Sequence, residues 1–366
     1  PGAQTFRSRV TDTLAAVETT PDEITVTFDG ALLTTSGTLS GDETWSGTVT
    51  LSGDVVVPQG TTLTIQPGTT VEAQPLTDDE RGGLDDSRIE LIIEGALDLQ
   101  GTAFSPVTMT STRVVPLASD WYGLRLTDTS DSTLTVHDLI VEAAVRGIWS
   151  DAGAHQDVID CQVRDVTGYG MWIEYGDGLR DGGDPGVTVT GNTVERAGSY
   201  GIWLDNSGAD ASWDNAVHDV STNTVDTVDD FALRLDVLDV ERVDVDDNVI
   251  SNVSGSGRGI SLTGRTTASN TNAHEIVGNQ ISNVVYGVNA ASSRSMLMQQ
   301  NTVTGASQYG LRCLGPSTSP CLEAHIIDNT VTGGVNGIWA RARNLNHVER
   351  NTLSGGTGDG INSSGY

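Results

Sequence analysis

Lysine is missing from this 366-residue sequence: all 19 of its cationic side chains are arginine, against 49 aspartate and glutamate residues. The formal net charge of −30 repels polyanions and argues against nucleic acid and anionic lipid as partners of the chain as a whole. Acidic side chains also keep a protein hydrated in concentrated salt, where screening weakens self-repulsion. We therefore interpret the composition as that of a halophilic or marine protein.

Long apolar runs and secretory signals are also missing. No run of about 18 apolar residues occurs, so the sequence predicts no membrane span. The sequence begins with Pro1 rather than Met, which we interpret as the start of a processed piece.

Cysteine is scarce, yet two of the three cysteines are close together. Cys313 and Cys321 bracket the segment CLGPSTSPC, in which Pro316 and Pro320 favour a turn. This spacing predicts a disulfide bond and hence an oxidising compartment. The expected location is therefore secreted or at the cell surface.

Aromatic residues make up only 5% of the chain, whereas glycine is abundant, with 43 residues. Much of the remainder is Thr, Val, Asp, Asn and Ser, a composition that favours short strands joined by tight turns over helices. An all-β fold is therefore expected.

From about residue 120 one unit recurs: Gly, an aliphatic residue, a variable residue, then a small or aliphatic residue. Successive units are 23 to 31 residues apart, which is typical of one solenoid coil with optional insertions. The units begin at Gly123, Gly147, Gly170, Gly201, Ala232, Gly259, Gly287, Gly310, Gly337 and Gly360.

An asparagine lies eight to eleven residues before each of the later glycines. These residues are Asn192, Asn223, Asn248, Asn279, Asn301, Asn329 and Asn351. Asp138 and Cys161 occupy the same position in the two preceding units. Asn tolerates a left-handed backbone, and its amide can bond the next coil, so the pattern predicts a structural Asn ladder. Cys161 is then a buried free thiol.

The N-terminal third has a different pattern, with strict alternation in 44–74 and 89–111 and turns at Pro58-Gln59-Gly60 and Pro67-Gly68. This stretch resembles the opening coils of pectate-lyase-like proteins, and the later units resemble generic parallel β-helix repeats. The resemblance covers 41–366 and implies a right-handed parallel β-helix solenoid of roughly 12–13 coils. It does not define an activity, because this superfamily contains lyases, glycosidases, esterases, tailspikes, adhesins and non-catalytic surface proteins.

Residues 1–40 lack the repeat and contain one strand, 23–28, after a candidate short helix at 10–17. We expect this segment to cap the first coil or to be the tail of an upstream domain. No polar or helical cap follows the last repeat, which favours self-association through coil ends into a fibre.

With the residue after each glycine pointing inward, the next residue points outward. Three consecutive coils then place Trp149, Trp172 and Trp203 in one row, followed by Arg234. Because coils are about 4.8 Å apart, the three rings are expected to form a flat exposed strip. We interpret it as a binding platform for a polysaccharide or cell-surface glycan. Rings covered by inserted loops are the alternative.

A second outward row places Asp151, Glu174, Asp205 and Asp236 beside the tryptophans. Neighbouring acids can raise one another's pKa or hold Ca²⁺, and their spacing suits glycosidase carboxylates. Glu174, Asp205 and Asp236 are therefore the candidate catalytic acids, and Arg234 is the candidate base of a lyase.

Asp177, Asp181 and Asp184 lie in a loop beside this row and are candidate Ca²⁺ ligands, although their spacing matches no EF-hand. No other cofactor is predicted. Polygalacturonase-like enzymes combine an Asn-Thr-Asp, an Asp-Asp, a Gly-His-Gly and an Arg-x-Lys motif; here only Asp229-Asp230 resembles one of them.

The sequence thus predicts an extracellular or cell-surface, non-catalytic β-helix that is either structural or glycan-binding. Two alternatives stay open: a polysaccharide lyase or glycoside hydrolase that uses the Trp149–Asp236 face, and a self-assembling surface fibre.

Overall fold

A computed structural model describes residues 3–7, 23–27, 33, 35–127, 134–151, 156–174, 186–205, 217–238, 242–265, 273–292, 295–314 and 321–365. The chain divides into two units, Pro1–Thr34 and Thr35–Tyr366. In the first unit, β1 (Ala3–Arg7) pairs antiparallel with β2 (Glu23–Thr27). The strand expected at 23–28 is therefore confirmed, whereas the helix expected at 10–17 falls outside the described residues.

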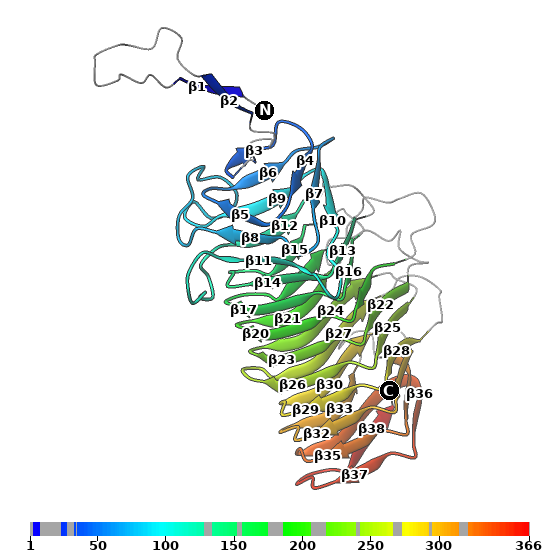
Figure 1. The fold of residues 1–366 in the computed structure, drawn as a ribbon. Helices are drawn as coiled ribbons and strands as arrows, with labels where there is room; N and C mark the ends of the chain where they lie inside the picture. Colours follow the sequence, from blue (N-terminus) through cyan, green and yellow to red (C-terminus); the bar gives the residue numbers. More distant parts are fainter. Residues whose placement is uncertain are drawn as a thin grey trace, which may run out of the picture. The chain divides into compact units, whose positions relative to one another are not determined.

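The second unit is a right-handed parallel β-helix, as expected. Each complete coil contributes a strand to each of three parallel sheets, and Figure 1 shows the coils stacked as rungs. The twelve strands of sheet 1 agree with the expected coil number. They are β5 (Thr48–Leu51), β8 (Thr70–Ala73), β11 (Val107–Ser111), β14 (Leu139–Glu142), β17 (Gln162–Val166), β20 (Thr193–Ala197), β23 (Thr224–Val228), β26 (Val249–Val253), β29 (Gln280–Ser282), β32 (Thr302–Thr304), β35 (Thr330–Thr332) and β37 (Thr352–Ser354).

Sheet 2 carries the glycine unit. Its strands are β3 (Gly37–Thr38), β6 (Val55–Val57), β9 (Glu90–Ile93), β12 (Gly123–Leu126), β15 (Ile148–Ser150), β18 (Met171–Glu174), β21 (Tyr200–Asp205), β24 (Phe231–Leu238), β27 (Arg258–Arg265), β30 (Tyr286–Ser292), β33 (Tyr309–Leu314), β36 (Asn336–Glu349) and β38 (Ile361–Gly365).

Sheet 3 completes each coil. It begins with β4 (Glu43–Trp45), β7 (Thr62–Ile65) and β10 (Ala96–Leu99). β10 is the last strand of this three-stranded sheet, and the third face resumes in the next coil with β13 (Leu134–His137), β16 (Gln156–Ile159), β19 (Thr188–Thr190), β22 (Val217–Ser221), β25 (Arg242–Asp246), β28 (His274–Val277), β31 (Met296–Gln299) and β34 (Cys321–Ile327). Strand β36 spans two faces, because its first half pairs with β33 and β38 and its second half pairs with β34.

Alternation of side chains fills the interior of the solenoid. In β7 the side chains of Leu63 and Ile65 point inward and are fully buried, while the intervening Thr64 is half-buried on the outside. The turns at Pro58-Gln59-Gly60 and Pro67-Gly68 are confirmed, since Thr61 N–H bonds Pro58 O at 3.1 Å and Thr69 N–H bonds Gln66 O at 3.2 Å. No helix in the described part of the chain is long and apolar enough to span a membrane.

Glycine recurs before the inward aliphatic residue because coils approach closely at this corner. A Cβ on Gly147 would lie 2.3 Å from the carbonyl oxygen of Gly170 and 2.4 Å from a methyl of Val163. Neither atom could move without disturbing the stack, so close approach, rather than an unusual φ, favours glycine here.

The Asn ladder is confirmed. The backbone N–H and the amide Nδ2 of Asn223 both donate to Oδ1 of Asn248, at 2.9 and 3.0 Å, and Asn223 Nδ2 also donates to Val189 O at 2.8 Å. The same pattern repeats from Asn192 to Asn351. Each amide thus satisfies buried polar groups of two coils.

Two details of the predicted ladder were wrong. Strand pairing places Ile140 beside Gln162, so Leu139 rather than Asp138 occupies the position next to Cys161. Asp138 has a φ of 47°, and the residues directly before the ladder positions, such as Thr222, also take positive φ. The residue with the left-handed backbone conformation therefore directly precedes the ladder residue. The bend at this residue turns the following amide side chain toward the next coil.

We predict that Asn248→Ala lowers the free energy of unfolding by about 2–4 kcal/mol, because it leaves two buried donors of Asn223 without their acceptor. Urea unfolding followed by circular dichroism measures the change. Asn344→Ala, on an exposed position of β36, is the control and should change stability by less than about 0.5 kcal/mol. Equal effects in the two variants would contradict the structural role of the ladder.

Candidate functional site

The row of tryptophans is confirmed as a geometric feature. Trp149, Trp172 and Trp203 occupy equivalent positions of β15, β18 and β21 and are directly paired in register. The ring centroids of Trp149 and Trp172 are 5.3 Å apart with planes 14° from parallel, and those of Trp172 and Trp203 are 4.6 Å apart at 7°. The three indoles therefore form one continuous stack along the solenoid axis.

The expectation of a flat exposed strip was wrong. Because the rings stack on one another, each covers the face of its neighbour, and Trp149 is only 8% exposed. At one end of the stack the guanidinium of Arg125 lies 4.8 Å from the Trp149 ring centroid, and at the other end that of Arg234 lies 4.6 Å from the Trp203 ring centroid. Arg146 lies beside the stack, 4.3 Å from the Trp149 centroid and 5.0 Å from the Trp172 centroid. The coil spacing of about 4.8 Å permits ring-to-ring stacking, which removes the open faces that a sugar ring would need.

A second aromatic column, which was not predicted, packs against the tryptophans. It consists of the residues directly before the repeated glycine, including Tyr169 and Tyr200. The ring centroid of Tyr169 lies 5.2 Å from that of Trp172, and the centroid of Tyr200 lies 5.4 Å from that of Trp203. The sequence does carry a signal for this column, because the residue before the repeated glycine is aromatic or Arg in consecutive units.

Arginine and aromatic rings continue this pattern along sheet 2. The guanidinium of Arg258 lies 4.8 Å from the ring centroid of Phe231, and that of Arg312 lies 5.3 Å from the Trp339 centroid. Each contact adds about 0.5–1 kcal/mol, or more where desolvated. We call the surface formed by Trp149, Trp172, Trp203 and the arginines that contact them the Trp–Arg face. Its side chains contact one another between neighbouring coils.

The carboxylate row is in register but is not uniformly exposed. Glu174, Asp205 and Asp236 lie opposite one another in β18, β21 and β24. Asp205 is only 7% exposed, so the expectation of a solvent-exposed row was wrong for this residue. Asp151 accepts a hydrogen bond from Arg125 at 2.8 Å.

Arg234 is engaged with its neighbours. Its Nε lies 2.6 Å from Asp236 Oδ2, its Nη1 donates to the hydroxyl of Tyr200 at 2.8 Å, and Trp203 Nε1 also donates to Asp236 Oδ2, at 3.0 Å. Burial lowers the pKa of Arg234, but the charge of Asp236 and the hydrogen bonds that Arg234 donates to Asp236 and Tyr200 outweigh it, so the pKa lies above its ordinary value. A lyase base must give up its proton, and this environment opposes that step.

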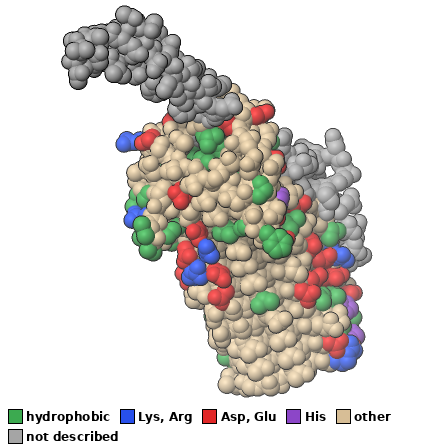
Figure 2. All heavy atoms as spheres, viewed as in Figure 1, with side chains coloured by type: hydrophobic (Ala, Val, Ile, Leu, Met, Phe, Trp, Pro, Cys, Tyr) green, Lys and Arg blue, Asp and Glu red, His purple; other side chains and the backbone are tan. Residues whose placement is uncertain are grey.

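A further acidic group, absent from the sequence predictions, lies on sheet 3. Arg242 is 2.7 Å from Asp244 and 3.2 Å from Glu275. Burial, and then the charge of Asp244, raise the pKa of Asp246 to about 6. Figure 2 shows acidic side chains gathered along the edge where Figure 1 places β22, β25 and β28. An acid with this pKa suits proton transfer near neutral pH.

The candidate Ca²⁺ ligands Asp177, Asp181 and Asp184 lie outside the described residues. Within the described part of the chain, no group of three or more His, Cys, Asp or Glu side chains is arranged to hold a metal ion.

The three cysteines are buried thiols in this structure. Cys313 and Cys321 face each other with their sulfurs 2.8 Å apart, and the predicted disulfide remains a prediction. Burial raises the pKa of the Cys161 thiol to about 12. Cys161 occupies the expected position in the ladder, since its N–H donates to Asn192 Oδ1 at 2.9 Å.

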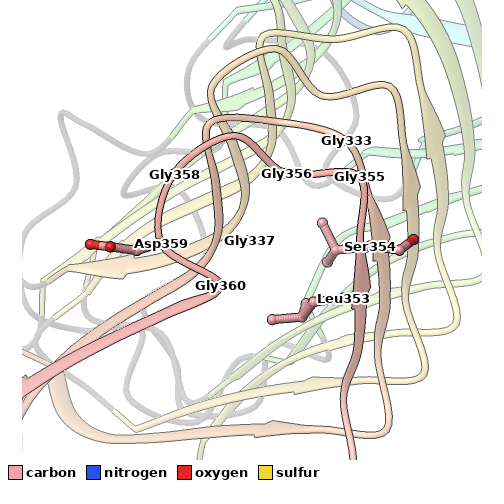
Figure 3. A pocket seen from close by; sticks show the side chains of 10 residues that line it. Gly333, Gly337, Leu353, Ser354, Gly355, Gly356, Gly358, Asp359 and Gly360 are labelled. Atoms are coloured by element: carbon pink, nitrogen blue, oxygen red, sulfur yellow. The ribbon is translucent and has the colours of Figure 1, made fainter.

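A pocket lies within the last two coils, between sheet 1 and the glycine-rich turns that follow it. Val331, Leu353 and Ser354 line one side and Gly337, Gly358 and Gly360 line the other. Figure 3 shows Asp359 pointing away from this pocket. With glycine and aliphatic side chains inside, the pocket provides none of the groups that acid–base chemistry requires.

Coils of parallel strands with an internal Asn ladder define a parallel β-helix protein. Residues 34–135 match the family described as a pectate-lyase like beta helix domain, and residues 258–366 match the right handed beta helix region. The chain belongs to this pectate-lyase-like β-helix superfamily. No protein among those with curated descriptions is significantly similar to the sequence.

Solved structures of other proteins are similar to this chain at low sequence identity. The catalytic unit of a GH87 α-1,3-glucanase from Streptomyces thermodiastaticus is 16% identical with a TM-score of 0.49, over 87% of this chain and 62% of that one. The surface adhesin PfbA of Streptococcus pneumoniae is 12% identical with a TM-score of 0.42, over 86% of this chain and 82% of that one. The chain therefore spans less than two thirds of the glucanase unit.

We predict that Trp172→Ala destabilises the protein by about 2–4 kcal/mol, because it removes two stacked pairs and leaves a gap inside the Trp–Arg face. Trp339→Ala is the matched control, since Trp339 has one stacked ring, Tyr309 at 5.3 Å. Thermal unfolding should show a larger drop for Trp172→Ala, and an equal or smaller drop would contradict the stack's role.

We also predict that Cys313 and Cys321 are bonded in protein recovered from an oxidising compartment, with a gain of about 2–3 kcal/mol from closing so short a loop. Thiol counting on unfolded, unreduced protein should find one free thiol, that of Cys161. Three free thiols would rule out the bond.

Proposed function

We propose that this chain is an extracellular, non-catalytic β-helix that serves as a rigid structural segment. The observation that carries the proposal is that the side chains of the Trp–Arg face contact one another. Its three indoles cover one another, and the Arg234 guanidinium is bonded to Asp236 and Tyr200. A binding or catalytic site needs groups that are free to meet a ligand, whereas these contacts tie neighbouring coils together.

The extracellular location rests on the cysteine pair. Cys313 and Cys321 are fully buried with sulfurs 2.8 Å apart, an arrangement that supports bond formation in an oxidising compartment. Membership of the pectate-lyase-like superfamily agrees with this location, and the resemblance adds no activity.

Glycan binding is the second candidate, favoured by the partial exposure of Trp172 and Trp203. Arg146 lies beside the Trp172 ring and Arg234 beside the Trp203 ring, so a glycan would meet ring edges and guanidinium groups rather than open indole faces. This geometry supports hydrogen bonding to sugar hydroxyls more than stacking on a sugar ring.

A panel of acidic and neutral polysaccharides, assayed for both binding and cleavage, tests the proposal. We expect no turnover by wild type on any member. Turnover that disappears in Glu174→Gln, Asp205→Asn, Arg234→Ala or Asp246→Asn, while an Asp98→Asn control on an exposed position of β10 keeps it, would contradict the non-catalytic assignment. Glycan binding lost only in a folded Trp172→Ala would instead support the second candidate.

A further inference from the structure

Three carboxylates are buried in the first coils. Asp54 is 2% exposed, Asp78 is 8% exposed and Glu90 is fully buried. Asp54 lies between β5 and β6, Asp78 lies in the loop 75–88 between β8 and β9, and Glu90 begins β9. Buried acids are rare unless they are paired or neutral, so their placement needs a physical explanation.

One oxygen of each carboxylate accepts a hydrogen bond from a backbone N–H. The N–H of Asp54 donates to Asp78 Oδ1 at 3.0 Å, and the N–H of Glu90 donates to Asp54 Oδ1 at 2.6 Å. The N–H groups of Leu84 and Asp85 donate to Glu90 Oε1, at 2.6 and 3.2 Å. The three acids therefore fasten the loop 75–88 to the first coils.

The second oxygen of each carboxylate is buried and makes no hydrogen bond of ordinary geometry with the described residues: Asp54 Oδ2, Asp78 Oδ2 and Glu90 Oε2. The backbone N–H of Gly82 still acts on the Asp54 carboxylate and partly offsets the rise of its pKa. Glycines of the loop close directly over two of the acids. A Cβ on Gly82 would lie 3.1 Å from Asp54 Oδ2, and a Cβ on Gly83 would lie 2.7 Å from the Glu90 carboxyl carbon. The packing leaves little room for a bulky ligand, and the described acids form no metal-binding group.

Other charged groups offset only part of this negative charge. Arg125 from β12 acts favourably on Glu90, whereas Asp85 at the end of the loop acts against it. Tyr122, beside β12, feels the charges of Glu90 and Asp85, and Glu80 of the loop approaches Gly37. Arg88 is paired with Asp85 at 2.8 Å. Among the described residues the acids of this site therefore outnumber its cations, and a bound proton would offset part of the excess negative charge.

We propose that Asp54, Asp78 and Glu90 form a proton-dependent latch that holds the loop 75–88 closed in acidic medium and loosens as the pH rises to neutral. With a proton bound, a buried carboxyl group is neutral and its burial costs little. When that proton leaves, an additional charge is buried beside the other acids, which repel it.

The sign of the pH dependence follows from burial. Burial first, and then the charges of Asp78 and Glu90, raise the pKa of Asp54 to about 7 from 3.8, against the lowering effect of the Glu90 N–H. The folded state thus binds more protons than the unfolded state between these values. The latch contributes its full stability below pH 3.8 and loses it as the pH rises through about 7.

Hydrogen exchange by mass spectrometry on the full chain tests the latch. Protection of peptides from residues 75–88, corrected for intrinsic exchange, should fall up to tenfold per pH unit between about pH 4 and 7, as expected for one proton, and level off above about pH 7. In Asp54→Asn the side chain is neutral at every pH, so protection should stay constant from about pH 4 to 9. Asp79→Asn, an exposed neighbour in the same loop, is the matched control and should titrate as wild type does.

An Asp54→Asn profile that falls with pH as steeply as that of wild type would overturn the proposal. Restored protection on adding CaCl₂ at pH 8.5 would also overturn it, in favour of a cation. If Asp54→Asn does not fold, Glu90→Gln provides the second variant. An infrared band of a protonated carboxylic acid in wild type at pH 6, absent at pH 9, then decides the matter: its presence supports the latch and its absence refutes it.

Discussion

Parallel main-chain hydrogen bonding holds neighbouring coils about 4.8 Å apart, and the side-chain arrangements of this protein depend on that spacing. At this distance an asparagine amide bridges two coils, and indole rings at equivalent positions stack on one another. The spacing also brings carboxylates and arginines of adjacent coils within ion-pair distance, as in Arg196 and Asp165 at 2.7 Å. Because the unit repeats, contacts of these kinds recur between successive coils of the solenoid.

The same constraint explains the absence of an open platform on the Trp–Arg face. Aromatic residues in one column stack on each other instead of facing a ligand, and Arg125 and Arg234 lie at the two ends of the stack. A sugar-binding face would need aromatic rings set apart or turned outward. Tryptophans at equivalent positions of successive coils therefore indicate stacking between coils as much as a binding site.

The sequence was sufficient for the fold. From Asn192 onward the glycine unit and the Asn positions mark the same two corners of each coil, whereas the first coils were recognised from alternation, turns and their resemblance to pectate-lyase-like proteins. The sequence also placed Trp149, Trp172 and Trp203 in one row. It could not predict how the rings are oriented, since a period-2 pattern distinguishes inside from outside and carries no information on stacking. Asp138 was misplaced by one residue, because an Asp can follow the pattern of the ladder while serving as the left-handed bend before it.

The acids of the first coils were beyond sequence reasoning for a different reason. Asp54, Asp78 and Glu90 are far apart in the chain, and nothing in their spacing distinguishes them from the many exposed acids. Only the fold of the loop 75–88 brings them together and removes them from water. Function at such places depends on tertiary burial, which the repeat pattern does not encode.

Native-state hydrogen exchange of the ladder amides tests the central claim most directly, because each ladder N–H donates to a side chain of the next coil rather than to a strand. We predict that the N–H groups of Asn192, Asn223 and Asn248 exchange as slowly as the core strands do, through unfolding of the solenoid. Exchange at rates typical of exposed turns would contradict the claim that the ladder and its coil spacing hold the structure together.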